Sequence, residues 1–177
     1  MFSVKIDPFL LKICEWTNQN VDLGMRGEFD GTRKEQLVGI IGQNVVCKML
    51  GAPLISTEKG FDGGVDLKIN NMRVDVKTMS RTVDVKPFFA CNFTALQEKY
   101  YVDYYMFTSL NTKTNVLTIC GVINKRMFML KKTTRPIGTT ITRSDGSQLK
   151  TLAKLYEIRV DQLEDVTNLR DLMRTIN

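Results

Sequence analysis

The chain has 177 residues, of which 43% are hydrophobic and 25% charged, and its formal net charge is +6. This length supports one compact domain that buries roughly 70% of the surface of the unfolded chain, and the composition excludes wholesale disorder and a coiled coil. The chain has no histidine, which excludes Ser-His and Cys-His nucleophile pairs and Cys/His zinc fingers. We therefore expect a single domain over residues 1–177 whose acid–base chemistry uses carboxylates, lysine, tyrosine or metal-bound water.

Two helices are predicted in the first third of the chain. Asp7-Pro8 is typical of a helix start, and apolar residues recur at helical spacing to about residue 18. After a glycine-containing loop, a longer helix begins at Thr32 or Arg33 and is ended by Gly51 and Pro53. Its Gly39 and Gly42 lie on one face, which allows another backbone or a ligand to approach closely.

A β-hairpin gives the strongest local signal in the sequence. A short strand is predicted near Leu54-Ile55, and beyond a glycine-rich approach the segments 65–69 and 72–78 both alternate apolar and polar residues. Asn70-Asn71, between these segments, can adopt the positive φ of a tight turn.

The remaining chain predicts a mixture of strands and helices. Strands are expected at 88–93, 104–109, 116–123 and 155–160, short helices at 94–99 and 124–130, an irregular or hairpin excursion at 133–150, and a last amphipathic helix from Asp161. Helices and strands in this order predict the α/β (α+β) class, a mixed sheet flanked by helices.

Cellular location and redox state are predicted from two further observations. No apolar run approaches the ~20 residues that cross a bilayer, and Lys5, Asp7 and Pro8 interrupt the N-terminus before a signal-peptide core can form. A cytoplasmic location is therefore expected. The cysteines occur singly in apolar stretches, which favours reduced core thiols over a zinc site or a disulfide framework: Cys14, Cys47, Cys91 and Cys120.

The hairpin places two acidic residues together. A two-residue turn at Asn70-Asn71 pairs Leu67 with Val74 on an apolar face and Asp66 with Asp75 on the other face. Like charges directly opposite each other destabilise a sheet. A divalent cation would compensate, because converging carboxylates form a hard-oxygen site suited to Mg²⁺ or Mn²⁺. Lys77 projects from the same face and can activate a water or stabilise charge on a reacting phosphate.

This pattern resembles the PD-(D/E)xK nuclease superfamily. The residues that carry the resemblance are Gly39-Ile-Ile-Gly42-Gln43 on a helix, Gly63-Gly64-Val65-Asp66, and Asp75-Val76-Lys77, and it covers about residues 33–110. The resemblance implies a restriction-endonuclease-like fold, metal binding by Asp66, Asp75 and the backbone carbonyl of Val76, and a catalytic role for Lys77. It also implies a 5′-phosphate and a 3′-hydroxyl as products. The small size and the lack of a separate recognition domain fit a stand-alone nuclease of phage, restriction or recombination type.

The chain departs from the superfamily at one position. A glutamate is usual on the first core helix, where this chain has Gln43. Glutamine can ligate through its carbonyl oxygen but carries no charge, so a weaker metal site is expected. Glu35, two turns earlier, is the alternative residue, and Gln43 is favoured over it.

The sequence thus predicts a Mg²⁺-dependent deoxyribonuclease, an endonuclease acting on DNA and acting as a homodimer if it cuts both strands. A catalytically inactive nucleic-acid-binding or assembly protein with the nuclease fold is the first alternative. The second is a basic adaptor with no nuclease ancestry, in which the hairpin aspartates are salt-bridged and exposed. Basic residues are spread over the C-terminal half, and phosphate binding and a solvated face explain them equally well. These residues are Lys125, Arg126, Lys131, Lys132, Arg135 and Arg143.

Overall fold

The fold is a mixed α/β arrangement around a central five-stranded sheet. The structure, a computed structural model, describes residues 1–21, 31–54, 64–142 and 148–176. The central sheet has the order β1-β6-β5-β3-β2. β3 and β5 are parallel, and the other neighbours are antiparallel. The strands are β1 (Phe2–Lys5), β2 (Leu67–Ile69), β3 (Met72–Arg81), β5 (Tyr104–Asn111) and β6 (Val116–Asn124). The predicted α/β class is confirmed.

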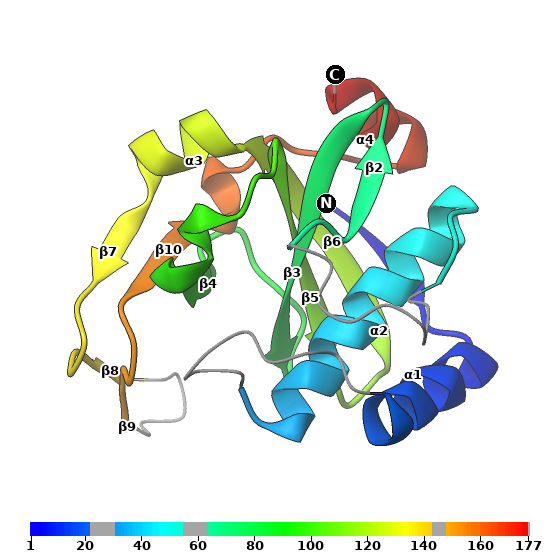
Figure 1. The fold of residues 1–177 in the computed structure, drawn as a ribbon, viewed down its shortest axis with the longest axis horizontal. Helices are drawn as coiled ribbons and strands as arrows, with labels where there is room; N and C mark the ends of the chain where they lie inside the picture. Colours follow the sequence, from blue (N-terminus) through cyan, green and yellow to red (C-terminus); the bar gives the residue numbers. More distant parts are fainter. Residues whose placement is uncertain (22–30, 55–63, 143–147, 177) are drawn as a thin grey trace.

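Two helices cover one face of this sheet, α1 (Pro8–Asn20) and α2 (Arg33–Leu50) (Figure 1). The predicted start and stop signals are confirmed: Asp7 caps α1, Thr32 and Glu35 form a capping box on α2, and Gly51 ends α2 in the left-handed conformation. The helices bury apolar side chains of α2 against Val74, Val76 and other residues of the sheet in one core cluster.

A second sheet covers the opposite face (Figure 1). It has the order β4-β10-β7, formed by β4 (Ala90–Thr94), β7 (Thr133–Arg135) and β10 (Leu155–Arg159). The 3₁₀ helix η1 (Ala95–Lys99) follows β4, and α3 (Lys125–Lys131) follows β6. Between the two sheets lies a second core cluster rich in aromatic rings, among them Phe93, Tyr105, Phe107, Phe128 and Tyr156. An aromatic core therefore fills the space between the second sheet and the face of β3 and β5 that is opposite to α2.

The predicted hairpin is confirmed in type and register. Asn70 and Asn71 have φ angles of 49° and 65°, and Leu67, Lys68 and Ile69 pair with Val74, Arg73 and Met72. The excursion over 133–150 contains β7 and a separate hairpin of β8 (Thr140–Thr142) and β9 (Gln148–Lys150). Leu54 is not in a strand. Ile55 lies outside the described residues, as do residues 22–30 of the loop predicted over 20–32.

Three expectations differ from the structure. The strand β1 was not predicted, although it pairs along β6 from Phe2 to Lys5. The strand predicted at 88–93 begins only at Ala90. The last helix does not begin at Asp161: a 3₁₀ turn, η2 (Val160–Gln162), comes first, and α4 (Leu169–Thr175) starts after Asn168.

The late start of α4 has a tertiary cause. The backbone of Glu164 exchanges hydrogen bonds with Val122, at 3.2 and 2.8 Å, and this bridge keeps the chain extended. Gly121 makes room for it, since a Cβ there would lie 2.7 Å from the Glu164 carbonyl oxygen. The apolar periodicity after Asp161 therefore serves an extended segment first and a helix only later.

The cysteine expectation is confirmed, because all four thiols are buried and free of disulfides. Among the described residues, no helix combines the length and the apolar character needed to cross a bilayer.

Gly42 is the point of closest approach between α2 and β3. A Cβ added there would lie 1.8 Å from the Oγ1 atom of Thr78, whereas one added at Gly39 meets nothing within 4 Å. We expect Gly42→Ala to lower the free energy of unfolding by about 1–3 kcal/mol, because overpacking outweighs the gain in helix propensity. Gly39→Ala, the control, is expected to raise it by roughly 0.5–1 kcal/mol. Urea unfolding of both variants measures the contrast, and equal effects would contradict the close approach.

Candidate functional site

Asp66 lies where β2 separates from β3. The paired register ends at Leu67 and Val74, so Asp66 is not a ladder partner of Asp75 as the extrapolated register expected. Its backbone N–H donates to the Val74 carbonyl at 3.1 Å. Its Oδ2 atom accepts a 2.6 Å hydrogen bond from the backbone N–H of Val76. The carboxylate is thereby fixed beside the peptide unit that directly follows Asp75.

Asp75 lies on β3 with its side chain buried between the two sheets. The residue is 2% exposed, and its Oδ2 atom lies 2.6 Å from the ammonium group of Lys77. The Lys77 side chain is 12% exposed, and its ammonium lies 5.2 Å from the centre of the Phe93 ring. A carboxylate removed from water needs a partner charge. Lys77 supplies that charge.

Val76 faces the opposite side of β3 and packs in the α2 core. Its N–H is bonded to Asp66, and in a strand the N–H and C=O of one residue point toward the same neighbour. Because β2 pairs with β3 only as far as Val74, the backbone edge at Val76 is directed toward Asp66 rather than covered by β2. The carbonyl that the resemblance implies as a ligand is therefore directed to the same edge as Asp66.

The structure brings Gln43 to this site and keeps Glu35 away from it. The Gln43 amide Nε2 donates to the backbone carbonyl of Asp66 at 3.2 Å. Glu35 is engaged at the start of α2, where its Oε2 atom accepts from the Thr32 N–H at 2.7 Å and from its hydroxyl at 3.0 Å. Of the two candidates left open by the sequence, Gln43 is the one positioned at Asp66.

The negative charge of Asp66 also affects a cysteine thiol on α2. Cys47 lies one turn after Gln43, and burial together with the nearby Asp66 carboxylate raises the pKa of the Cys47 thiol to about 11. This thiol therefore stays protonated at neutral pH and is no competing ligand for a divalent cation.

Sequence reasoning missed the aromatic residue that packs against the segment before Asp66. Gly64, two positions before Asp66, has a φ of +82°, and a Cβ there would lie 2.5 Å from the ring of Tyr100. The Nζ atom of Lys125, the first residue of α3, donates to the carbonyls of Glu98 and Tyr100 at 2.7 and 2.6 Å. The only feature of the sequence that indicates a close contact at this point is the glycine pair before Asp66.

Tyr105, the β5 neighbour of Asp75, is also part of the surroundings. It is fully buried, and within the described part of the chain its hydroxyl has no hydrogen-bond partner. Burial is the main cause of a pKa raised above the usual value for tyrosine, and the charges of Asp75 and Glu98 add to it. Tyr105 is thus a neutral phenol beside a carboxylate and can serve as a hydrogen-bond donor but not as a base.

The oxygen atoms that this site offers as ligands suit a hard divalent cation, bound with modest affinity. Two carboxylates, a backbone carbonyl and an amide oxygen are all oxygen ligands, which Mg²⁺ and Mn²⁺ prefer, and Mg²⁺ usually keeps several waters. In the ranges described, no three His, Cys, Asp or Glu side chains gather in a group that could hold a metal. A cation here would therefore depend on two carboxylates, with Lys77 competing for one of them.

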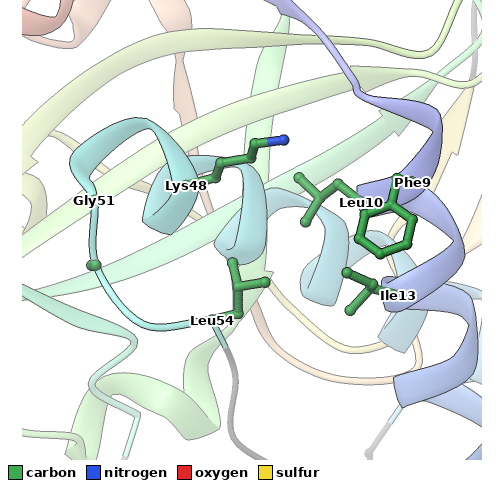
Figure 2. A pocket seen from close by; sticks show the side chains of 7 residues that line it. Phe9, Leu10, Ile13, Lys48, Gly51 and Leu54 are labelled. Carbon is green, nitrogen blue, oxygen red and sulfur yellow. The ribbon is translucent and has the colours of Figure 1, made fainter.

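A groove beside α1 is separate from these residues. Its volume is about 380 Å³, and Figure 2 shows side chains of α1 together with Leu54 and the end of α2 around it. The lining is apolar except for Lys48, whose ammonium pairs with Asp7 at 2.6 Å. The residues that line the groove are Phe9, Leu10, Ile13, Lys48, Gly51, Ala52 and Leu54. It shares no residue with the acidic site and supplies no carboxylate for a metal.

Comparisons of the chain with protein families, with curated proteins and with solved structures found no match.

Proposed function

We propose that the protein is a Mg²⁺-dependent deoxyribonuclease, an endonuclease of the PD-(D/E)xK type that hydrolyses phosphodiester bonds in DNA. One observation carries the proposal: Asp66 is fixed on the peptide unit following Asp75, and Lys77 lies on the Asp75 carboxylate. Two carboxylates and a lysine on and beside β3 are the groups that metal-assisted hydrolysis of a phosphodiester needs.

Each residue has a role that its position supports. A bound cation supplies Lewis acidity and lowers the pKa of a bound water. Asp66 and Asp75 are the residues that would hold such a cation, together with the backbone carbonyl of Val76. Lys77, already within 2.6 Å of Asp75, orients the attacking water or stabilises charge developing on the phosphate. Gln43 holds the Asp66 backbone through its amide nitrogen and can present its carbonyl oxygen to the site.

A plasmid-nicking assay tests this function directly. Supercoiled plasmid is incubated with the protein in Mg²⁺, in Mn²⁺ and in EDTA. Conversion to open-circular or linear DNA only with a divalent cation supports the proposal. Intact plasmid in all three conditions, from folded protein that binds Mn²⁺, would support the second candidate.

The second candidate is a nuclease-fold protein that binds nucleic acid without cutting it. Gln43 favours it, because a neutral amide replaces the charge that the superfamily usually has on this helix. The Asp75–Lys77 ion pair favours it as well, since the lysine already neutralises one of the two carboxylates. Such a protein would bind DNA equally well with and without Mg²⁺ and release no nicked product.

Gln43→Glu tests the position of this side chain relative to the cation. A carboxylate beside Asp66 adds a negative charge and loses the amide bond to the Asp66 carbonyl. We expect tighter Mn²⁺ binding, by about tenfold, and a metal-free protein less stable by about 1 kcal/mol. Titration calorimetry and urea unfolding measure the two effects. Gln19→Glu, on the exposed part of α1, adds the same charge elsewhere and is expected to change neither. Unchanged Mn²⁺ affinity in Gln43→Glu would place the side chain away from the cation.

A further inference from the structure

Four lysines converge on the 3₁₀ helix η1 from separate parts of the chain. Lys99 belongs to η1 itself, Lys125 begins α3, Lys132 follows α3, and Lys154 precedes β10. We refer to Lys99, Lys125, Lys132 and Lys154 as the η1 lysine cluster. Within the described ranges, none of the four forms an ion pair with a carboxylate.

Tyr156 and η1 hold the cluster together. The ammonium groups of Lys132 and Lys154 lie 3.7 and 5.6 Å from the centre of the Tyr156 ring, so they are no further apart than the sum of those two distances. The Tyr156 hydroxyl donates to the carboxylate of Glu98, and the Lys154 carbonyl accepts from the N–H of Ala95 at 2.8 Å. Lys132 and Lys154 thus lie beside η1, to which Tyr156 and the Lys154 backbone are hydrogen-bonded.

The cluster lies in the part of the chain that carries the whole positive excess. Residues 86–159 contain 12 Lys and Arg against 4 Asp and Glu, whereas the rest of the chain contains 13 against 15. Besides β5 and β6 of the central sheet, this part contains the second sheet and α3, which lie on the side of the central sheet opposite to α2 (Figure 1). Asp75 and Lys77 face the same side, since Lys77 lies over the Phe93 ring of β4.

A chain of contacts joins the cluster to the proposed site. Lys125 holds the carbonyl of Tyr100, and the Tyr100 ring occupies the space above Gly64, two residues before Asp66. The Lys99 ammonium lies 5.6 Å from the centre of the same Tyr100 ring. A polyanion bound at Asp66 and Asp75 would therefore pass beside these ammonium groups.

We infer that the η1 lysine cluster binds the sugar-phosphate backbone of a nucleic acid next to the phosphate that is cleaved. The inference rests on the proposed function for the position of the cleaved bond. Lys99, Lys132 and Lys154 provide the phosphate contacts, and Lys125 supports η1 through its bonds to Glu98 and Tyr100. Duplex DNA carries a charge every ~1.7 Å of its axis, so several ammonium groups near one another can each meet a phosphate.

The test compares two triple variants that remove the same charge. Lys99→Gln/Lys132→Gln/Lys154→Gln neutralises the cluster, whereas the matched control, Lys12→Gln/Lys34→Gln/Lys113→Gln, neutralises exposed lysines on α1, on α2 and in the β5–β6 turn. Binding of a fluorescein-labelled DNA duplex and of its single strand is measured by anisotropy in EDTA, from about 50 to 200 mM salt. Because no metal is present, the measurement does not depend on cleavage.

For the cluster variant we expect at least roughly tenfold weaker duplex binding near 150 mM salt and a slope of log K against log salt that is smaller by about 2–3. The control is expected to keep the wild-type slope. If both variants weaken equally, or neither does, the cluster is not the contact surface. If Lys132→Gln impairs folding, the Lys99→Gln/Lys154→Gln pair of exposed residues gives the same comparison with a slope change of about 2.

The nicking assay keeps the two conclusions separate. Nicking by the wild-type protein together with unchanged binding by the cluster variant would overturn the cluster and leave the nuclease in place. Cluster-dependent binding without any nicking would support the cluster and overturn the nuclease.

Discussion

Asp75→Asn is expected to abolish metal-dependent nicking and to destabilise the metal-free protein as well. The activity is lost because the buried carboxylate that would hold the cation becomes neutral. The stability falls because the Lys77 ammonium, 12% exposed, loses its partner at 2.6 Å. Breaking a buried ion pair from one side costs about 3 kcal/mol. Plasmid nicking in Mg²⁺ and urea unfolding in EDTA measure the two losses.

A double variant separates the two losses. Asp75→Asn/Lys77→Met removes both charges and is expected to recover most of the stability, because two neutral side chains no longer leave a charge unpaired. It is expected to remain inactive. Asp161→Asn, which breaks the exposed pair with Arg159, should keep full activity and change stability by less than about 1 kcal/mol. Wild-type nicking by Asp75→Asn would overturn the proposed site.

Lys77→Met is expected to lower the rate of nicking by about 10²–10³-fold while changing DNA affinity little. A positioned charge that acts on the reacting phosphate or water contributes on this scale. The Lys77 side chain is almost buried, so it offers little surface to DNA. Single-turnover rates and anisotropy in EDTA separate the rate from the affinity. A parallel fall in both would make Lys77 a DNA-binding residue.

The same variant gives a second readout that does not need activity. Without Lys77, the Asp75 carboxylate has lost its ammonium partner, and a divalent cation can supply the missing positive charge. Mg²⁺ is therefore expected to raise the melting temperature of Lys77→Met more than that of the wild type. Lys68→Met, on the exposed side of β2, is the control and should respond to Mg²⁺ like the wild type. An equal response of Lys77→Met would show that no cation binds at Asp75.

The pairing of Lys77 with Asp75 reverses an expectation drawn from the sequence. Two aspartates opposed across a hairpin would repel, and removing one would leave the metal-free protein as stable or slightly more stable. In the structure, the Asp66 carboxylate accepts a hydrogen bond from the Val76 N–H, and the Asp75 carboxylate pairs with the Lys77 ammonium. Each carboxylate is therefore already stabilised. The alternation of residues places side chains on faces, but it does not show which of several charged groups on a face will meet.

The sequence by itself determined the local elements of this protein. Asp7 and Thr32 start α1 and α2, Gly51 ends α2, and Asn70-Asn71 sets the register of β2 and β3, because capping bonds and positive φ angles depend on neighbours in the chain. The apolar face of the hairpin follows from the same alternation.

Only the tertiary structure decided the rest. Four features depend on segments far apart in the sequence. Gln43 rather than Glu35 lies at Asp66, and the Tyr100 ring packs against Gly64. Asp75 is buried beneath a second sheet, and α4 begins only at Leu169. The physical reason is that burial and charge pairing are set by whichever groups packing brings within a few ångströms. Periodicity describes one segment at a time and contains no information on its distant partner.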